Sequence, residues 1–155
     1  MISKRIQEVE PSRTVELTNR IAAMRREDIP VIGLNVGEPD LDTPAHIRRA
    51  AKEAIEEGFT RYTPVMGVPE IREAIASKLM RENHVEYAPD EITLGPGAKQ
   101  CIYAALLALC DPGDEVIIPC PCWVSYTEMV RMAGGVPVAV RTAEDFSLDL
   151  AHIER

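Results

Sequence analysis

The chain has 155 residues, of which 46% are apolar and 27% are charged, and its formal net charge is −8. This composition is typical of a globular protein with one core, and no apolar run approaches the ~20 residues of a membrane-spanning helix. The negative charge and dispersed basic residues disfavour nucleic-acid binding, and the N-terminus lacks an apolar signal core, so we expect a cytoplasmic protein that acts on small molecules, without membrane or nucleic-acid partners.

The first predicted elements are a helix and a short β-like run. Residues 13–25 have helical spacing of apolar positions, and Ser12 precedes them as a cap. Residues 31–36 are mostly apolar and lead into Gly37-Glu38-Pro39-Asp40, where glycine and proline interrupt regular structure. We therefore expect a loop with an unusual backbone after a short strand.

Two further helices follow. Thr43 is the expected cap of a helix that has Pro44 at its first position and ends at Gly58. Residues 59–65 are expected to be extended and carry Tyr62. Residues 69–82 then have apolar side chains at every fourth position, which predicts a helix with a structural face.

A glycine-rich loop between a strand and a helix is the first sign of a ligand site. Residues 92–94 are β-prone, Gly95-Pro96-Gly97-Ala98 follows, and an apolar helix is expected over 98–110. The first N–H groups of a helix have no helical partner and attract anions. This loop is therefore a candidate phosphate site.

The next strand delivers an aromatic side chain to the same edge of the sheet. Residues 116–118 are expected to form this strand, and the proline-rich turn after it leads to Trp123. Ligands of α/β proteins bind at the carboxyl ends of parallel strands. An indole ring there can cover a flat ligand.

The chain continues with a predicted helix over 123–133, a break at Gly134-Gly135, a strand over 136–140 and the start of a helix over 148–155. The order βαβαβ predicts a parallel or largely parallel sheet with flanking helices, hence an α/β fold.

The four cysteines do not indicate a metal site. Cys101 and Cys110 lie on opposite faces of one predicted helix, and Cys120 and Cys122 form a single C-x-C without a second pair at zinc-binding spacing. We expect thiols in a buried or loop environment and no metal.

The glycine loop is open to three interpretations. A Rossmann dinucleotide site requires a third glycine where this chain has Gln100, and an acidic residue where it has Cys120. A P-loop requires a longer spacer and a Ser or Thr after Lys99. A plain tight turn from strand to helix remains open on the loop alone.

Five motifs along the chain, taken together in their order, are more specific than the glycine loop alone. They are N-V-G-E-P-D at 35–40, R-Y-T-P at 61–64 with Gly67 and P-E-I-R-E-A-I at 69–75, G-A-K-Q at 97–100, D-P-G-D-E-V at 111–116, and W-V-S-Y at 123–126. With these motifs nearly the whole chain resembles the class I aminotransferases of the pyridoxal phosphate fold type I family, especially aspartate aminotransferase-like enzymes. The resemblance implies that fold and the cofactor pyridoxal 5'-phosphate.

The resemblance also implies roles for individual residues. The loop of Gly97, Ala98 and Lys99 would give backbone N–H groups to the cofactor phosphate, and Trp123 would stack on the pyridine ring. Tyr62 matches a tyrosine that reaches the cofactor phosphate of a neighbouring subunit, which implies a homodimer. Gly37 matches a position whose backbone meets the substrate carboxylate; packing and turn roles stay open as alternatives for Trp123, Tyr62 and Gly37.

No lysine of this chain matches the Schiff-base lysine of the family, so no catalytic residue is assigned. In the family that lysine and the other groups around the reacting atoms come later in the chain than Arg155. We therefore expect residues 1–43 to be an N-terminal segment, and residues 44–155 to be the first, incomplete part of the large cofactor-binding domain.

The expected function is transfer of an amino group between an amino acid and a 2-oxo acid by a longer parent enzyme, with the 155 residues inactive alone. The alternative is a non-catalytic truncated fragment that binds a cofactor or a partner protein. A nucleotide-binding module is the third hypothesis.

Overall fold

The computed structural model describes residues 2–7 and 9–154. They fall into two compact units, and each is described by itself below. The first unit comprises the chain up to Gly37 together with the chain from Lys99 onward, and the second comprises Glu38–Ala98.

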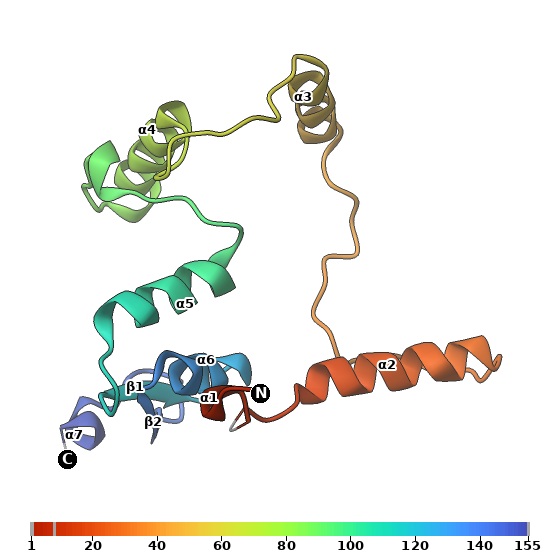
Figure 1. The fold of residues 1–155 in the computed structure, drawn as a ribbon, viewed down its shortest axis with the longest axis vertical. Coiled ribbons are helices and arrows are strands. Elements are labelled where there is room, and N and C mark those ends of the chain that lie inside the picture. The colour runs from red at the N-terminus through yellow and green to blue at the C-terminus, as the bar shows by residue number, and fades with distance from the viewer. Residues whose placement is uncertain (1, 8, 155) are drawn as a thin grey trace. The chain divides into compact units, whose positions relative to one another are not determined.

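The first unit contains a two-stranded parallel sheet. Strand β1 (Glu115–Cys120) pairs with β2 (Val136–Arg141) in a register that sets Glu115 opposite Val136 and Cys120 opposite Arg141. Helix α6 (Ser125–Ala133) connects the two strands and lies against them (Figure 1). This βαβ unit confirms the parallel arrangement expected from the order of elements.

A tight turn precedes each strand of this βαβ unit. Gly134 ends α6 with φ +95°, a conformation that favours glycine, and Gly113 has φ +97° in the turn before β1. The Gly113 N–H donates to the Gly134 carbonyl at 3.0 Å, so the two turns are joined. This hydrogen bond holds the starts of the two strands beside each other.

The core of the first unit lies between α6 and the sheet. Ile118 of β1 and Val140 of β2 are buried, and so are Met129 and Val130 on the facing side of α6. Val130 is 2% exposed and is the most deeply buried of the four. Contacts across this small core hold the helix on the sheet.

Replacing Val130 with alanine removes buried apolar surface and leaves a void, which is expected to lower the free energy of unfolding by about 2 kcal/mol. Urea unfolding followed by circular dichroism measures the change. The same substitution at Val124, which is 57% exposed, is the matched control and should cost far less. Equal losses at the two positions would contradict this description of the core.

Four further helices belong to the first unit: α1 (Lys4–Gln7), α2 (Arg13–Arg26), α5 (Ala98–Leu109, whose first residue falls in the other unit) and α7 (Leu150–Ile153). The Ser12 side chain accepts a hydrogen bond from the Val15 N–H at 3.4 Å, so the predicted cap of α2 is confirmed. The helices expected over 13–25 and 98–110 are also confirmed within one residue at each end.

The second unit is helical. It contains α3 (Ala45–Glu56), α4 (Pro69–Lys78), the π-helical turn η1 (Leu79–Asn83) and the 3-10 turn η2 (Pro89–Glu91). Arg72 of α4 donates to the Pro89 carbonyl at 3.0 Å, which ties η2 to α4. The helix expected over 69–82 is confirmed, with its last turn wound as a π-helix.

Several local expectations are wrong. Residues 31–36 and 92–94 are not strands, because a strand requires a hydrogen-bonded neighbour and the described sheet has only β1 and β2. Leu94 makes one backbone hydrogen bond to a neighbouring segment, from its N–H to the Met66 carbonyl at 3.0 Å. The order βαβαβ is therefore reduced to βαβ.

Two helix starts also differ from the expectation. Pro44, not Thr43, occupies the N-cap position of α3 and provides no side-chain cap. Helix α6 begins at Ser125, so Trp123 lies in the turn before it. Among the described residues, no helix has both the length and the apolar character needed to cross a membrane.

Candidate cofactor-binding site

The glycine loop leads directly into α5. Gly97 has φ +94°, and a Cβ placed there would meet no atom within 4 Å. The backbone conformation at position 97, and not crowding by neighbouring atoms, therefore requires glycine there. The Gly97 N–H donates to the Gly95 carbonyl at 2.7 Å, so in this conformation the donors left for an anion begin with Ala98 and Lys99 in the first turn of α5.

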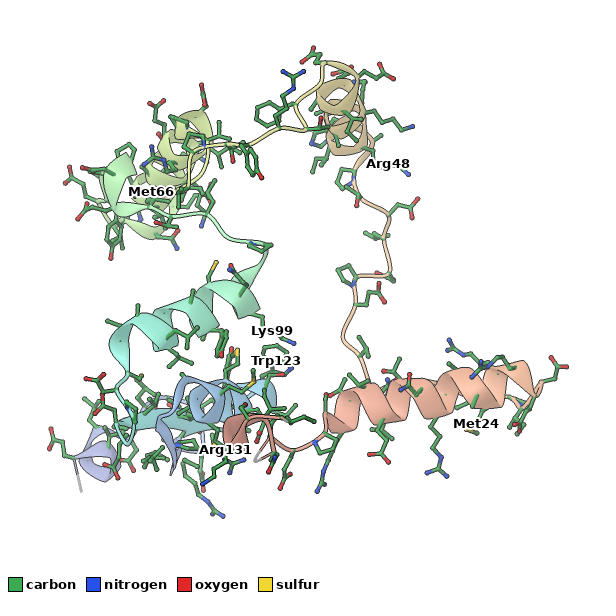
Figure 2. The ribbon with its side chains drawn as sticks, viewed as in Figure 1. Met24, Arg48, Met66, Lys99, Trp123 and Arg131 are labelled. Atoms are coloured by element: carbon green, nitrogen blue, oxygen red, sulfur yellow. The ribbon has the colours of Figure 1, made fainter. Side chains whose placement is uncertain are left out.

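Trp123 presents an accessible ring beside that first turn. Its side chain is 43% exposed, and its ring meets Tyr126 edge to face with centroids 5.5 Å apart. The Lys99 ammonium lies 4.5 Å from the Trp123 ring centroid (Figure 2). The structure thus brings together Lys99 and Trp123, two of the residues predicted to bind the cofactor.

The contact between Lys99 and Trp123 has a consequence for any planar ligand. A cation over an aromatic ring at an exposed site is worth about 0.5–1 kcal/mol. A flat ring that stacks on the face contacted by Lys99 must displace the ammonium, whereas the Tyr126 edge contact can stay. Lys99 is therefore a movable neighbour of the stacking surface.

The other predicted site residues have few contacts. Tyr62 lies in the second unit and its side chain is fully exposed. Gly37 has an ordinary φ, and a Cβ there would meet no atom within 4 Å, so neither backbone strain nor packing requires glycine at this position. A requirement for glycine at Gly37 would have to come from a bound molecule.

Each unit, taken by itself, contains a cavity. A hollow of about 270 Å³ in the second unit lies between the Thr63–Val68 turn and Leu94-Gly95-Pro96. An apolar cavity of about 170 Å³ in the first unit lies between Ile102 and Leu106 of α5 and the β1 and α6 side chains. In the part of the chain that the structure describes, no group of three or more His, Cys, Asp or Glu side chains could hold a metal ion.

Replacing Gly97 with alanine tests the loop conformation. An L residue at φ +94° costs about 1–3 kcal/mol, so we expect the loop to change shape and phosphate-bearing ligands to bind roughly tenfold more weakly. Isothermal titration calorimetry with pyridoxal phosphate measures the affinity. Gly37→Ala, at an unstrained position, is the control that should leave this affinity unchanged. Equal affinities for the wild type and Gly97→Ala would contradict a strained phosphate loop.

The geometry defines a class of protein. Free N–H donors at the start of α5 suit a phosphate group, and the exposed Trp123 ring beside them suits a planar ring on the same molecule. Helix α5 precedes a parallel βαβ unit, and Trp123 lies in the turn between β1 and α6 of that unit, so the chain is an α/β protein.

Known proteins similar to this chain identify its family. Residues 29–155 match the family described as aminotransferase class I and II. The chain is 52% identical over 150 residues to the bifunctional aspartate aminotransferase and glutamate/aspartate-prephenate aminotransferase of Petunia hybrida, covering 96% of this chain and 31% of that protein. It is 44% identical over 156 residues to the aspartate/prephenate aminotransferase of Thermus thermophilus, covering 99% of this chain and 40% of that protein.

Solved structures of aspartate aminotransferases also match this chain. The aspartate aminotransferase from Thermus thermophilus with maleate matches with a TM-score of 0.94 and 43% identity, over 100% of this chain and 41% of that one. The aspartate aminotransferase from Rhizobium meliloti matches with a TM-score of 0.91 and 44% identity, over 99% and 39%. The chain belongs to the aminotransferase class I and II family, has the α/β fold of these enzymes, and spans about a third to two fifths of the length of the relatives compared.

Sequence reasoning missed three contacts near the site. The Lys99 ammonium on the Trp123 ring required knowledge of where the turn before α6 lies against α5. The sulfur atoms of Cys120 and Cys122 lie 3.7 Å apart, although the spacing alone gave no reason to expect a contact. The edge contact of Tyr126 could have been found from its position three residues after Trp123.

Proposed function

We propose that this chain is the cofactor-binding part of a pyridoxal phosphate-dependent aminotransferase, which transfers an amino group between an amino acid and a 2-oxo acid. The observation that carries the proposal is the exposed Trp123 ring, held next to the first turn of α5 by a turn that starts at the end of β1. Family membership supports the reaction type.

Each site residue has a distinct task in this proposal. The backbone N–H groups of Ala98 and Lys99 bind the cofactor phosphate, and Gly97 gives the loop its shape. Trp123 stacks on the pyridine ring, fixes its orientation and excludes water from one face. When bound, pyridoxal phosphate supplies an electron sink for the substrate's α-carbon.

Proton transfer at the substrate α-carbon requires a base, and we assign that task to a lysine outside these 155 residues. The chain alone is therefore inactive in this proposal. The division at residues 43 and 44, with an N-terminal segment followed by the first part of the cofactor-binding domain, belongs to the same proposal. The chain's share of the relatives' length supports this assignment.

Aspartate is the proposed amino donor, because the names of the relatives compared above state aspartate. The Gly37 backbone N–H is the proposed contact for the substrate carboxylate, and the open space where a Cβ would lie supports close approach there. A homodimer, in which Tyr62 reaches the cofactor phosphate of the neighbouring subunit, is also proposed. The complete exposure of Tyr62 supports a role in contacts with another chain. A cytoplasmic location completes the proposal.

A hybrid enzyme tests the function. In the hybrid, residues 1–155 replace the matching segment of the Thermus thermophilus aspartate/prephenate aminotransferase, which supplies the remainder of the fold. We expect the hybrid to bind pyridoxal phosphate and to transfer the amino group of aspartate to a 2-oxo acid. A hybrid that folds with the parent's circular dichroism and melting behaviour, yet binds no cofactor, would contradict the proposal.

A further inference from the structure

Two thiols lie in contact at the end of β1. The Sγ atoms of Cys120 and Cys122 are 3.7 Å apart, and both side chains are half-buried. The backbone of Cys120 is fixed, because its carbonyl accepts hydrogen bonds from the Thr142 N–H at 3.0 Å and the Thr142 hydroxyl at 3.1 Å. The sheet therefore fixes the backbone of Cys120, and the short turn through Pro121 brings the Cys122 sulfur beside the Cys120 sulfur.

The surroundings of this pair favour a dithiol over a metal site. Burial, together with the hydrogen bond and charge of Cys120, raises the pKa of the Cys122 thiol above its ordinary value. Within the described ranges, no third His, Cys, Asp or Glu completes a metal-binding group around the two sulfurs. A disulfide bond requires sulfurs at about 2.05 Å, so the two sulfur atoms, now 3.7 Å apart, must move closer for the bond to form.

We propose that Cys120 and Cys122 form a redox-active dithiol that a small-molecule disulfide, such as glutathione disulfide, converts reversibly into a disulfide within the loop. The thiolate of one cysteine attacks a sulfur of glutathione disulfide, forms a mixed disulfide and releases one glutathione thiolate. The second cysteine then attacks the mixed disulfide and releases the second glutathione. The protein loses two electrons and two protons, and glutathione disulfide is reduced to two glutathione molecules.

The contact between the sulfurs determines which product accumulates. The second attack occurs within one loop, so its rate does not depend on the concentration of free glutathione. The mixed disulfide should therefore be short-lived in the presence of both cysteines. A disulfide closed across a single residue is confined by its short ring, and strained disulfides are the readily reduced ones, so the reaction should reverse with excess glutathione.

The disulfide would act on the site described above. Trp123 directly follows Cys122, and its ring contacts Lys99 and Tyr126. Joining the two sulfurs restricts the turn that positions the indole, so oxidation should shift the emission of Trp123, the single tryptophan of the chain. This dithiol chemistry does not depend on the proposed aminotransferase activity.

The experiment uses the whole chain with Cys101→Ser and Cys110→Ser, which leaves only the pair of interest. The protein is incubated with glutathione disulfide, free thiols are blocked, and glutamyl endopeptidase releases residues 116–128, a fragment bounded by Glu115 and Glu128 that contains Cys120 and Cys122. Mass spectrometry is expected to show this fragment short of two hydrogen atoms and without blocking groups. Excess dithiothreitol should restore both thiols.

Single variants supply the controls. With Cys120→Ser or Cys122→Ser added, the remaining thiol lacks its partner, so the fragment should retain one glutathione. The proposal is overturned if the protein with both cysteines also accumulates the glutathione adduct, forms disulfide-linked dimers instead, or stays reduced while the same protein in denaturant is oxidised. Circular dichroism of each variant confirms that the fold is retained, and the comparison on the pair-containing protein stands even where a single variant does not fold.

Discussion

Replacing Trp123 with alanine is expected to weaken the binding of pyridoxal phosphate by roughly tenfold to a hundredfold. Stacking of an aromatic side chain on a heterocyclic ring contributes about 1–3 kcal/mol, and each 1.4 kcal/mol corresponds to a factor of ten in affinity. The substitution also removes the edge contact with Tyr126 and exposes the cofactor's ring to water. Equilibrium dialysis measures the affinity without relying on the indole's emission.

Trp123→Phe is the matched control, because it keeps a flat ring at the same position and should recover most of the affinity. Tyr126→Leu separates the two aromatic contacts: it removes the edge contact alone and should have a smaller effect than Trp123→Ala. Retention of full affinity by Trp123→Ala would show that the ring does not stack on the cofactor. Equal losses in the alanine and phenylalanine variants would likewise contradict stacking.

Gly67→Ala should be the most destabilising single substitution in the second unit. A Cβ at Gly67 would lie 2.4 Å from Leu94 Cδ1 and 2.8 Å from Leu94 Cβ, and Gly67 has φ +99°. Backbone strain alone costs about 1–3 kcal/mol, and the overlap adds to it because Leu94 is held by its N–H bond to the Met66 carbonyl. We expect a loss of about 3 kcal/mol or more, measured by urea unfolding.

Gly58→Ala isolates the steric part of this loss. Gly58 also has a positive φ, +78°, but a Cβ there would meet no atom within 4 Å, so this variant should lose only the strain energy. Adding Leu94→Ala to Gly67→Ala should recover part of the stability, since it removes the leucine atoms beyond Cβ. Equal losses at Gly67 and Gly58 would show that the two segments do not approach each other as described.

Local signals predicted helices well and strands only where a partner was present. Helix α2 over 13–26 begins after a serine cap. Helix α6 ends at Gly134, which has a left-handed conformation, so each of these boundaries has a chemical cause within a few residues. Residues 92–94 have the same β-prone character as β1, but lack a hydrogen-bonded strand beside them. Strand formation depends on distant segments, which a local pattern does not contain.

The same distinction applies to the candidate site, where local features were predictable and contacts between distant residues were not. The start of α5 was predictable from neighbouring residues, because a glycine-rich loop precedes an apolar helical run, and Gly97 has a positive φ in that loop. The Lys99 contact with Trp123 joins residues 24 positions apart, through the fold of the chain between them. The proximity of Cys120 and Cys122 depends on the course of one turn, which the C-x-C spacing leaves open.

The most direct test of the account is a titration of the whole chain with 4′-deoxypyridoxine 5′-phosphate, followed by the emission of Trp123. This analogue has the ring and phosphate of the cofactor but lacks the aldehyde, so it cannot form adducts with surface lysines. We predict saturable quenching that inorganic phosphate reverses by competition, with none from 4′-deoxypyridoxine or NAD at the same concentrations. Absence of saturable quenching, or equal quenching by the analogue without phosphate, would contradict a site in which the α5 loop and Trp123 bind one phosphorylated planar molecule.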